Sequence, residues 1–358
     1  MELLRVLVAI LAFFKFLWDS FFTKNKSPKP FRLLRLPSLT HDVIFSEMQI
    51  EELYQLSKCS RRSRYAVKMF TRRQKYYFEI TARESLCSLE ISNRCCRNSF
   101  YRELRPMGIR QRIDDVSLST HSEDFWAAMK EEILYFFDVF TKKVNGLRFY
   151  DTTNVTNMTE LLKEKTVLPF DWVVYGVRVI DDEMYKYILK EFKDAKTLSI
   201  CAYSSADFRF ADMEPFTGEY VIIENANWLT VDHLTRCFMN VEKVQLWTST
   251  KGYLNIPVFN QFLNEWRNGL REVKLNLECD CTNFDLQSIF KNVPTTQVKR
   301  VEVGNWKRVF DDGKCFLIRQ KESGMEALVY FNNYIYIPIS PSICFTTNFR
   351  LLRDDEFN

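Results

Sequence analysis

Short β-rich runs recur at a steady interval through the second half of this 358-residue chain, and this repeat constrains the fold more than any other feature. The interval is roughly 23 to 29 residues, which lies in the range of leucine-rich-type repeats. The runs are 198–200, 220–223, 244–247, 273–277 and 301–303. Because one such unit cannot bury its apolar side alone, we expect the units to stack on one another.

Helical patterns lie between these runs. Four segments repeat apolar residues at helical spacing, and Thr230 stands at the N-cap position of the second one. They are 183–192, 230–239, 258–268 and 286–291. Alternating strands and helices predict an α/β fold, an irregular leucine-rich-repeat-like βα solenoid with a parallel sheet. An ordinary α/β sandwich is the alternative, and the regular period favours the solenoid.

The segment 74–170 is mixed. A helix is expected over 124–140, and 147–150 predicts a strand, the first unit of the repeat. Residues 72–110 are rich in Arg and Cys and show little periodicity. Within them, 95–97 is interpreted as a solvated loop in preference to a phosphate-binding patch.

Residues 31–70 predict a compact helical hairpin. Pro37 suits the first turn of a helix, where its missing N–H costs nothing, and Leu39 and Val43 follow at helical spacing. Glu51 and Glu52 suit the start of a second helix. Roughly 40 residues bury too little apolar surface to be stable alone. The hairpin is therefore either a docking module or a helical cap on a larger domain.

The same stretch resembles an F-box, the short helical module that binds the Skp-type adaptor of a cullin ubiquitin ligase. The resemblance rests on Leu36-Pro37, Glu52-Leu53, Leu56-Ser57 and Cys59-Ser60, and it departs from the common pattern at Ile44-Phe45. It implies a Skp-family adaptor, and through it a cullin, as partners. The residues that it implies for adaptor contact are Leu34, Leu36, Pro37, Ile44, Met48, Leu53 and Leu56. We interpret His41, on the same helix, as a solvated surface residue.

Part of the repeat region, 227–249 and 259–277, resembles the nematode type 2 F-box-associated domain. The matching residues are Trp228, Leu229, Thr230, Leu234, Asn260, Phe262, Leu263, Trp266 and Gly269. A later stretch matches less well, because Gln320 stands where that family commonly has a second Arg.

These matching residues are interpreted mainly as structural. Trp228, Phe262 and Trp266 are expected in the core, and Gly269 is expected to end the 258–268 helix with a positive φ. The resemblance implies a domain that binds a target protein, and the target-binding residues are not readable from the pattern. Exposed aromatic residues near strand ends are the candidates, namely Trp247, Tyr253 and Trp306.

An apolar segment, 3–22, precedes the hairpin. It is nearly long enough to span a bilayer, but Arg5, Lys15 and Asp19 interrupt it. Three interpretations remain open: a membrane anchor or interfacial helix, a helix packed on the body, and an incorrectly extended start. The basic residues that follow favour a cytosolic side for the rest of an anchored chain, and 28–30 suits a linker.

Neither the composition nor the motifs of the sequence indicate an enzyme, a metal site or a nucleic-acid-binding protein. The net charge of +4 is small and does not favour nucleic acid as a partner. The ten cysteines lack zinc spacing and suit free thiols in a reducing compartment. The sequence has no Gly-rich phosphate loop, G-x-S-x-G or HExxH. We therefore expect no enzyme activity and no catalytic, cofactor-binding or metal residues.

The sequence thus predicts a receptor subunit in five parts: an apolar leader and linker (1–30), an F-box (31–73), a connecting region (74–170), a repeat-like domain (171–335) and a tail (336–358). By resemblance, it would recruit a target protein to an SCF-type ligase in the cytoplasm or nucleus. A membrane-tethered repeat protein that binds a partner without ubiquitination is the alternative.

Overall fold

The computed structural model describes most of the chain from residue 36 onward. The described residues are 36–83, 86–93, 99–105, 108–113, 116–118, 125–141, 143–151, 155–165, 169–177, 179–238, 240–247, 256–269, 276–280, 285–304, 306–332 and 342–353. The apolar segment 3–22, the linker 28–30 and the basic stretch 95–97 lie outside them. The described chain divides into two compact units. The first draws on Met1–Phe78, Leu89–Glu103 and Met107–Lys142, and the second on Glu79–Ser88, Leu104–Pro106 and Lys143–Asn358.

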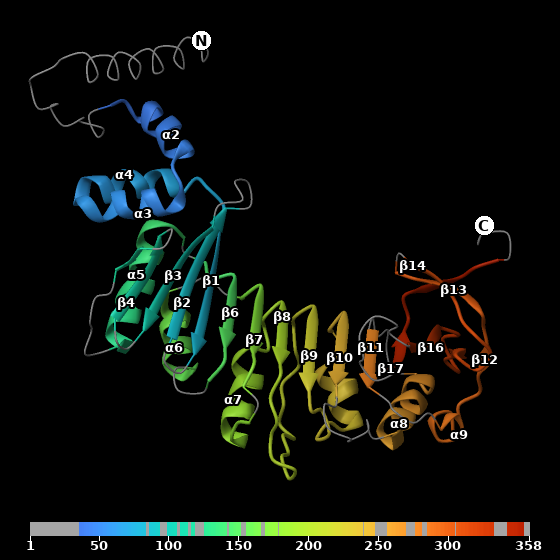
Figure 1. Ribbon diagram of the computed structural model, residues 1–358. Coiled ribbons are helices and arrows are strands. Elements are labelled where there is room, and N and C mark those ends of the chain that lie inside the picture. Colours follow the sequence, from blue (N-terminus) through green and yellow to red (C-terminus); the bar gives the residue numbers. More distant parts are fainter. Residues whose placement is uncertain are drawn as a thin grey trace, which may run out of the picture. The chain divides into compact units, whose positions relative to one another are not determined.

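The described part of the first unit begins with three short helices where the sequence predicts two. They are α2 (Ser38–Glu47), α3 (Ile50–Cys59) and α4 (Arg61–Thr71), and α3 and α4 lie side by side (Figure 1). The predicted second helix breaks at Ser60, which is fully extended with φ −164° and ψ 163°. Its hydroxyl accepts a hydrogen bond from the N–H of Ser63 at 3.1 Å, so a serine expected inside a helix starts a new one. The expected helix over 124–140 is present as α5 (Phe125–Val139).

Strands follow in the stretch where the sequence shows little periodicity. Residues 76–118 contain β1 (Tyr76–Arg83), β2 (Leu86–Asn93), β3 (Ser99–Arg105), β4 (Gly108–Ile113) and β5 (Val116–Leu118), which are neighbours in that order. In β1 the pattern has a period of two, not 3.6: Phe78, Ile80 and Ala82 are buried and their neighbours are not.

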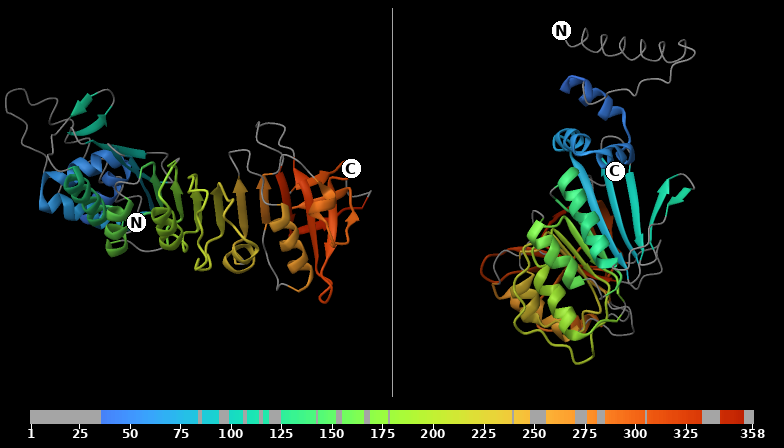
Figure 2. Two further views of the ribbon diagram at one scale, coloured as in Figure 1. Left: turned by 90° about the horizontal axis from the view of Figure 1, so that it is seen from below. Right: turned by 90° about the vertical axis from the view of Figure 1, so that its left-hand side faces the viewer.

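Parallel strands in chain order make up much of the second unit. They are β6 (Gly146–Phe149), β7 (Trp172–Tyr175), β8 (Thr197–Ile200), β9 (Tyr220–Glu224), β10 (Lys243–Trp247) and β11 (Asn276–Asp280). Each pairs with the next, and β1 pairs in parallel with β6. The left view of Figure 2 shows these strands side by side in chain order, from green to orange. Short helices followed by a mixed α/β region with a parallel sheet are therefore confirmed.

Helices connect three of these strand pairs: α6 (Val155–Lys165) follows β6, α7 (Asp182–Glu191) follows β7, and α8 (Ile256–Arg267) follows β10. The expected core residues Phe262 and Trp266 are 0% exposed on α8, and both make edge-to-face contacts with Phe345. Trp228 is also buried, and Gly269 has the predicted positive φ, 110°.

One face of the sheet carries an unbroken apolar row. Cross-strand partners on eight neighbouring strands are all buried to 1% exposure or less. The row is Ile80, Leu147, Val173, Leu198, Val221, Val244, Leu277 and Phe345. Each such side chain contributes about 1.5–3 kcal/mol when fully buried, so this row is a main part of the second unit's core.

The fifth predicted repeat strand is not part of the parallel sheet. β13 (Arg300–Val303) pairs antiparallel with β14 (Trp306–Val309) and with β18 (Phe349–Leu351) in a separate three-stranded sheet. The tight connection through Gly304, at φ 59°, explains the difference, because a parallel neighbour needs a crossover of a dozen or more residues.

The C-terminal segment also joins a sheet. β17 (Ser342–Thr346), in the predicted tail, pairs with β11 and with β16 (Glu326–Asn332). β16 pairs in turn with β15 (Cys315–Arg319), which pairs with β12 (Thr296–Gln297). The short helix α9 (Leu286–Ile289) precedes β12.

A chain segment without a helix, 201–219, connects β8 to β9. It buries Phe208, Met213 and Phe216 in place of a helical face. The helix expected over 230–239 is instead a π-helix, η2 (His233–Cys237), in which the N–H of Phe238 donates to the carbonyl of His233 at 3.3 Å. Wider turns of this kind place side chains where a regular helix cannot.

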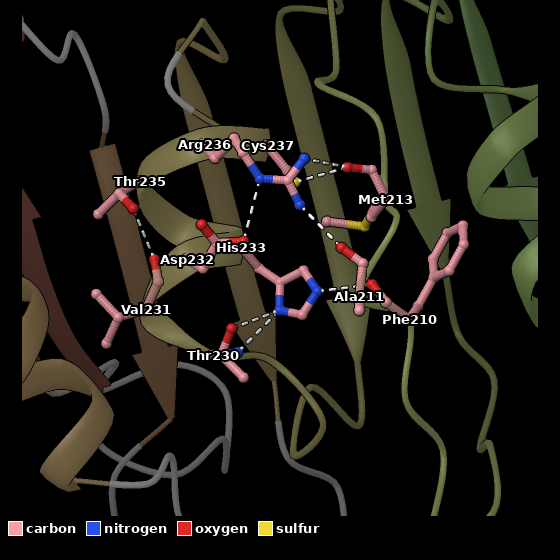
Figure 3. A network of polar contacts seen from close by, with 10 residues as sticks. All are labelled: Phe210, Ala211, Met213, Thr230, Val231, Asp232, His233, Thr235, Arg236 and Cys237. Carbon is pink, nitrogen blue, oxygen red and sulfur yellow. Dashed lines mark hydrogen bonds and ion pairs between the residues drawn. The ribbon is translucent and has the colours of Figure 1, made fainter.

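Side chains of η2 hold the backbone of this segment (Figure 3). The N–H of Thr230 donates to Nδ1 of His233 at 3.0 Å, so Nε2 carries the proton and donates to the carbonyl of Phe210 at 2.8 Å. Arg236 donates to the carbonyls of Met213 at 2.9 Å and Ala211 at 3.0 Å. The segment's carbonyls thus find donors outside its own sequence.

We predict that His233→Ala loosens this segment. The change leaves the Phe210 carbonyl and the Thr230 N–H without their partner, which costs about 1–3 kcal/mol. Urea denaturation should show the loss of stability, and limited proteolysis should cut faster within 203–216. Lys190→Ala, at an exposed position on α7, is the control. Unchanged stability and cleavage would contradict this role of His233.

Candidate functional site

An apolar surface lies on α2. Leu39 is 57% exposed and Val43 is 44% exposed, one helical turn apart. Pro37 is also exposed, and Ile44 and Met48 are half-buried. We call Leu39 and Val43 the exposed face of α2. Exposed aliphatic side chains on one short helix are typical of a helix that docks on a partner.

The opposite side of α2 is fastened to α4. Phe45 is 1% exposed and meets Phe70 edge to face at 5.6 Å between ring centroids. The two terminal guanidinium nitrogens of Arg73 donate hydrogen bonds to the two carboxylate oxygens of Asp42, at 2.8 and 2.5 Å. His41 is half-buried and stacks on Phe45 at 5.6 Å, so it is not the solvated residue that the sequence suggests. Phe45 is one of the two residues at which the sequence departs from the common F-box pattern, and its burial anchors this helix.

The residues predicted to contact an adaptor differ from the two of this surface. Pro37 is exposed, and Leu36, Ile44, Met48 and Leu56 are half-buried. Leu34 lies outside the described residues. Leu53 is only 1% exposed and belongs to the core of the unit.

Several exposed apolar residues of this unit were missed by the sequence-based prediction. Leu39 and Val43 belong to the exposed face of α2, and Tyr65 and Met69 are 65% and 42% exposed on α4. The signal was present as helical spacing, but spacing alone does not tell the exposed stripe from the buried one.

A buried polar network joins α3 to α5. The Tyr54 hydroxyl donates to Glu132 at 2.5 Å, and Lys58 lies 3.5 Å from the other oxygen of that carboxylate. Lys58 also lies over the ring of Tyr135, 3.5 Å from its centroid, and the Tyr135 hydroxyl hydrogen-bonds Ser57 at 2.6 Å. Glu132 is only 6% exposed. Burial strengthens these polar contacts and fixes their geometry.

Further contacts join α4 to the same helix. Arg64 lies over the Tyr135 ring at 4.5 Å, Lys68 pairs with Asp138, and the Thr71 hydroxyl donates to the carbonyl of Val139 at 2.5 Å. The three N-terminal helices are therefore one part of a unit that includes α5, and they are not a separate hairpin.

A second surface, in the other unit, is the face of the parallel sheet opposite the apolar row. Arg148 bonds Glu79 at 3.0 Å and lies over Trp172 at 4.8 Å. Lys243 lies over Tyr220 at 5.0 Å. A third pair of this kind joins Arg83 to Tyr150 at 4.9 Å. Trp, Tyr and Arg are the residue types most often found at the energetic centre of protein interfaces.

The aromatic residues predicted to contact a target have different outcomes. Trp306, on β14, is 72% exposed. The backbone of Trp247 ends β10, while its side chain and the whole of Tyr253 lie outside the described part.

The other residues of the second resemblance serve the fold. Asn260 donates to the carbonyls of Ile289 and Lys291, both at 2.9 Å, and so connects α8 to α9. Gln320 donates to the carbonyl of Trp266 at 2.9 Å, which satisfies a carbonyl at the end of α8.

No group of three or more His, Cys, Asp or Glu among the described residues could hold a metal ion. Burial raises the pKa of Cys237 to about 11 and that of Cys315 to about 12, so both thiols stay protonated and unreactive at neutral pH. None of the helices in the described ranges is long and apolar enough to cross a membrane.

Comparison with known proteins gives two findings. Residues 33–75 match the F-box domain. The chain is also similar to the Skn-1 dependent zygotic transcript 15 protein of Caenorhabditis elegans, with 23% identity over 334 residues that cover 84% of this chain and 93% of the relative. No solved structure matches the chain. The F-box match spans α2, α3 and α4, so the exposed face of α2 belongs to it.

We predict that Glu132→Ala destabilises the three helices. Tyr54 and Lys58 lose their buried acceptor, and hydrogen bonds to charged groups are worth about 1.5–3 kcal/mol. Urea denaturation followed by circular dichroism should show the loss. Glu131→Ala, the exposed neighbour on α5, is the control. Equal stability of the two variants would contradict a structural role for the network.

Proposed function

We propose that this protein is a substrate-recognition subunit of an SCF-type cullin ubiquitin ligase. In this proposal the exposed face of α2 docks on a Skp-family adaptor, and the second unit binds a target protein. The observation that carries it is the F-box match over residues 33–75. Within these residues Leu39 and Val43 are exposed on α2, while Phe45 of the same helix is buried against Phe70. An F-box generally implies an SCF-type adaptor role, and such proteins are generally non-catalytic.

The contribution of such a subunit to the reaction is proximity. It holds the target near the ubiquitin-carrying enzyme and so raises the effective concentration of the target's lysines. Rigid attachment matters for this task, and the polar network between α3 and α5 supports it within the first unit. F-box proteins are typically cytoplasmic or nuclear, and the proposal assigns the protein to those compartments.

The second unit is proposed to be a leucine-rich-repeat-like βα solenoid of the type 2 F-box-associated kind. Parallel strands in chain order from β6 to β11 support this, as do the structural roles of Asn260, Phe262 and Trp266. The face with Trp172, Arg148 and Tyr220 is one candidate for target contact.

We predict that Leu39→Asp with Val43→Asp abolishes adaptor binding. The two exposed side chains would carry charge into an apolar groove, and a loss of about 3 kcal/mol or more reduces affinity at least about 100-fold. Co-purification of the full chain with a Skp-family adaptor measures it. Circular dichroism should stay unchanged, because both residues are exposed.

The matched control is Leu351→Asp, an exposed apolar residue of the second unit. It should retain the adaptor. Failure of the unaltered chain to bind any Skp-family adaptor, or equal binding by the double variant, would overturn the proposal. Leu53 is not used as a test because its burial makes any change a test of folding.

A further inference from the structure

One side of α4 carries exposed basic and apolar side chains together. Arg61, Tyr65, Met69 and the C-cap residue Arg72 recur at helical spacing and are all exposed, Tyr65 to 65% and Met69 to 42%. We call these four residues the outer stripe of α4. The residues that α4 buries in the first unit are Ser63, Val67, Phe70 and Thr71. Packing of that buried side therefore holds the outer stripe toward solvent.

The chain around this stripe is strongly basic. Residues 53–78 hold eight Lys or Arg and no Asp or Glu. Carboxylates from outside this stretch pair with three of the eight cations: Lys58 with Glu132, Lys68 with Asp138, and Arg73 with Asp42. Within the described part of the chain, Arg61 and Arg72 form no ion pair. The outer stripe therefore presents two positive charges that the described residues do not neutralise, beside two exposed apolar groups.

A second basic stretch joins α2 to the apolar segment 3–22. Residues 23–35 hold five Lys or Arg and no Asp or Glu. Basic residues directly beside an apolar segment are attracted to anionic lipid headgroups, and an apolar segment of this kind can lie in the interface of a bilayer. Both stretches lie outside the described residues, so they contribute composition and no geometry. They are a second observation, separate from α4, that favours a lipid surface.

We propose that the outer stripe of α4 docks on the surface of an anionic phospholipid bilayer. Arg61 and Arg72 meet the negative headgroups, while Tyr65 and Met69 lie at the boundary between headgroups and water. Because the opposite side of α4 stays packed in the first unit, the helix rests on the surface and does not insert. The apolar segment 3–22 favours lipid over an acidic protein, since one partner then accounts for both features. This inference goes beyond the proposed receptor role and does not depend on it.

Sedimentation of the full chain with vesicles tests the proposal. One set of vesicles is phosphatidylcholine alone, and in the other about one third of the lipid is phosphatidylserine. The chain should partition more strongly into the anionic set, and raised salt should reduce the difference. Arg61→Gln with Arg72→Gln should lower the partition coefficient for the anionic vesicles roughly 30-fold, equivalent to about 2 kcal/mol. Arg61→Lys with Arg72→Lys should restore binding, because the charge is kept.

Two controls separate the stripe from other sources of binding. Lys190→Gln with Lys321→Gln removes the same charge from exposed positions of the second unit and should bind as the unaltered chain does. Leu11→Asp with Phe14→Asp places charge in the apolar segment 3–22 and weakens any insertion by it. The arginine variant is measured with and without this change, so that tight insertion of the segment does not hide the contribution of α4. Circular dichroism should show an unchanged fold, because Arg61 and Arg72 are exposed.

Equal partitioning between the two kinds of vesicle, with and without the change in segment 3–22, would overturn the inference. So would anionic-vesicle binding that the arginine variant leaves unchanged in both forms. A peptide of Glu and Asp that binds the chain where vesicles do not, and loses affinity in the arginine variant, would assign the stripe to a protein partner and also overturn it. No adaptor is present in these assays, so their failure is distinguishable from failure of the proposed receptor role.

Discussion

The apolar row from Ile80 to Phe345 is the constraint on which the second unit depends. A shift of any strand by one residue would turn its buried side chain outward and bring a residue of the opposite face into its place. The row therefore fixes the register of eight strands at once. The same register decides which residues face the other way, and so places Arg148, Trp172 and Tyr220 on a common open face. Packing on one side of the sheet thus determines which side chains are exposed on the other side.

The sequence predicted those parts of the fold in which local pattern and burial agree. Leu198, Val221 and Val244 lie in strands as expected, and Phe262 and Trp266 lie on the buried side of α8. The prediction was wrong where the local sequence pattern does not decide which strands pair with each other. The pattern of β13 predicts a further strand of the parallel sheet. Its actual antiparallel pairing depends on the turn at Gly304 and on β18, some 50 residues away.

The candidate site shows the same division. Helical spacing located α2, yet it did not separate Leu39, which is exposed, from Phe45, which is buried. That choice is made by contacts with Phe70 on α4 and with Arg73, which follows α4. Likewise Leu53 is buried, and no local signal in the sequence distinguishes it from an exposed apolar residue of the same helix. The docking module is consequently larger than its motif, because part of its stability comes from Glu132 and Tyr135, about 80 residues further along the chain.

The contacts of His233 and Arg236 have a consequence for how such a domain varies. The connection 201–219 has no helix to satisfy its own carbonyls, and donors from η2 do so instead. The conformation of residues 201–219 therefore depends on side chains of η2 as well as on their own sequence. Grafting that connection into a related protein would fail unless residues 230–237 were moved with it, and natural variation in the two stretches should be correlated. Here the part of the chain that can be exchanged independently is accordingly this pair of neighbouring connections, not either one alone.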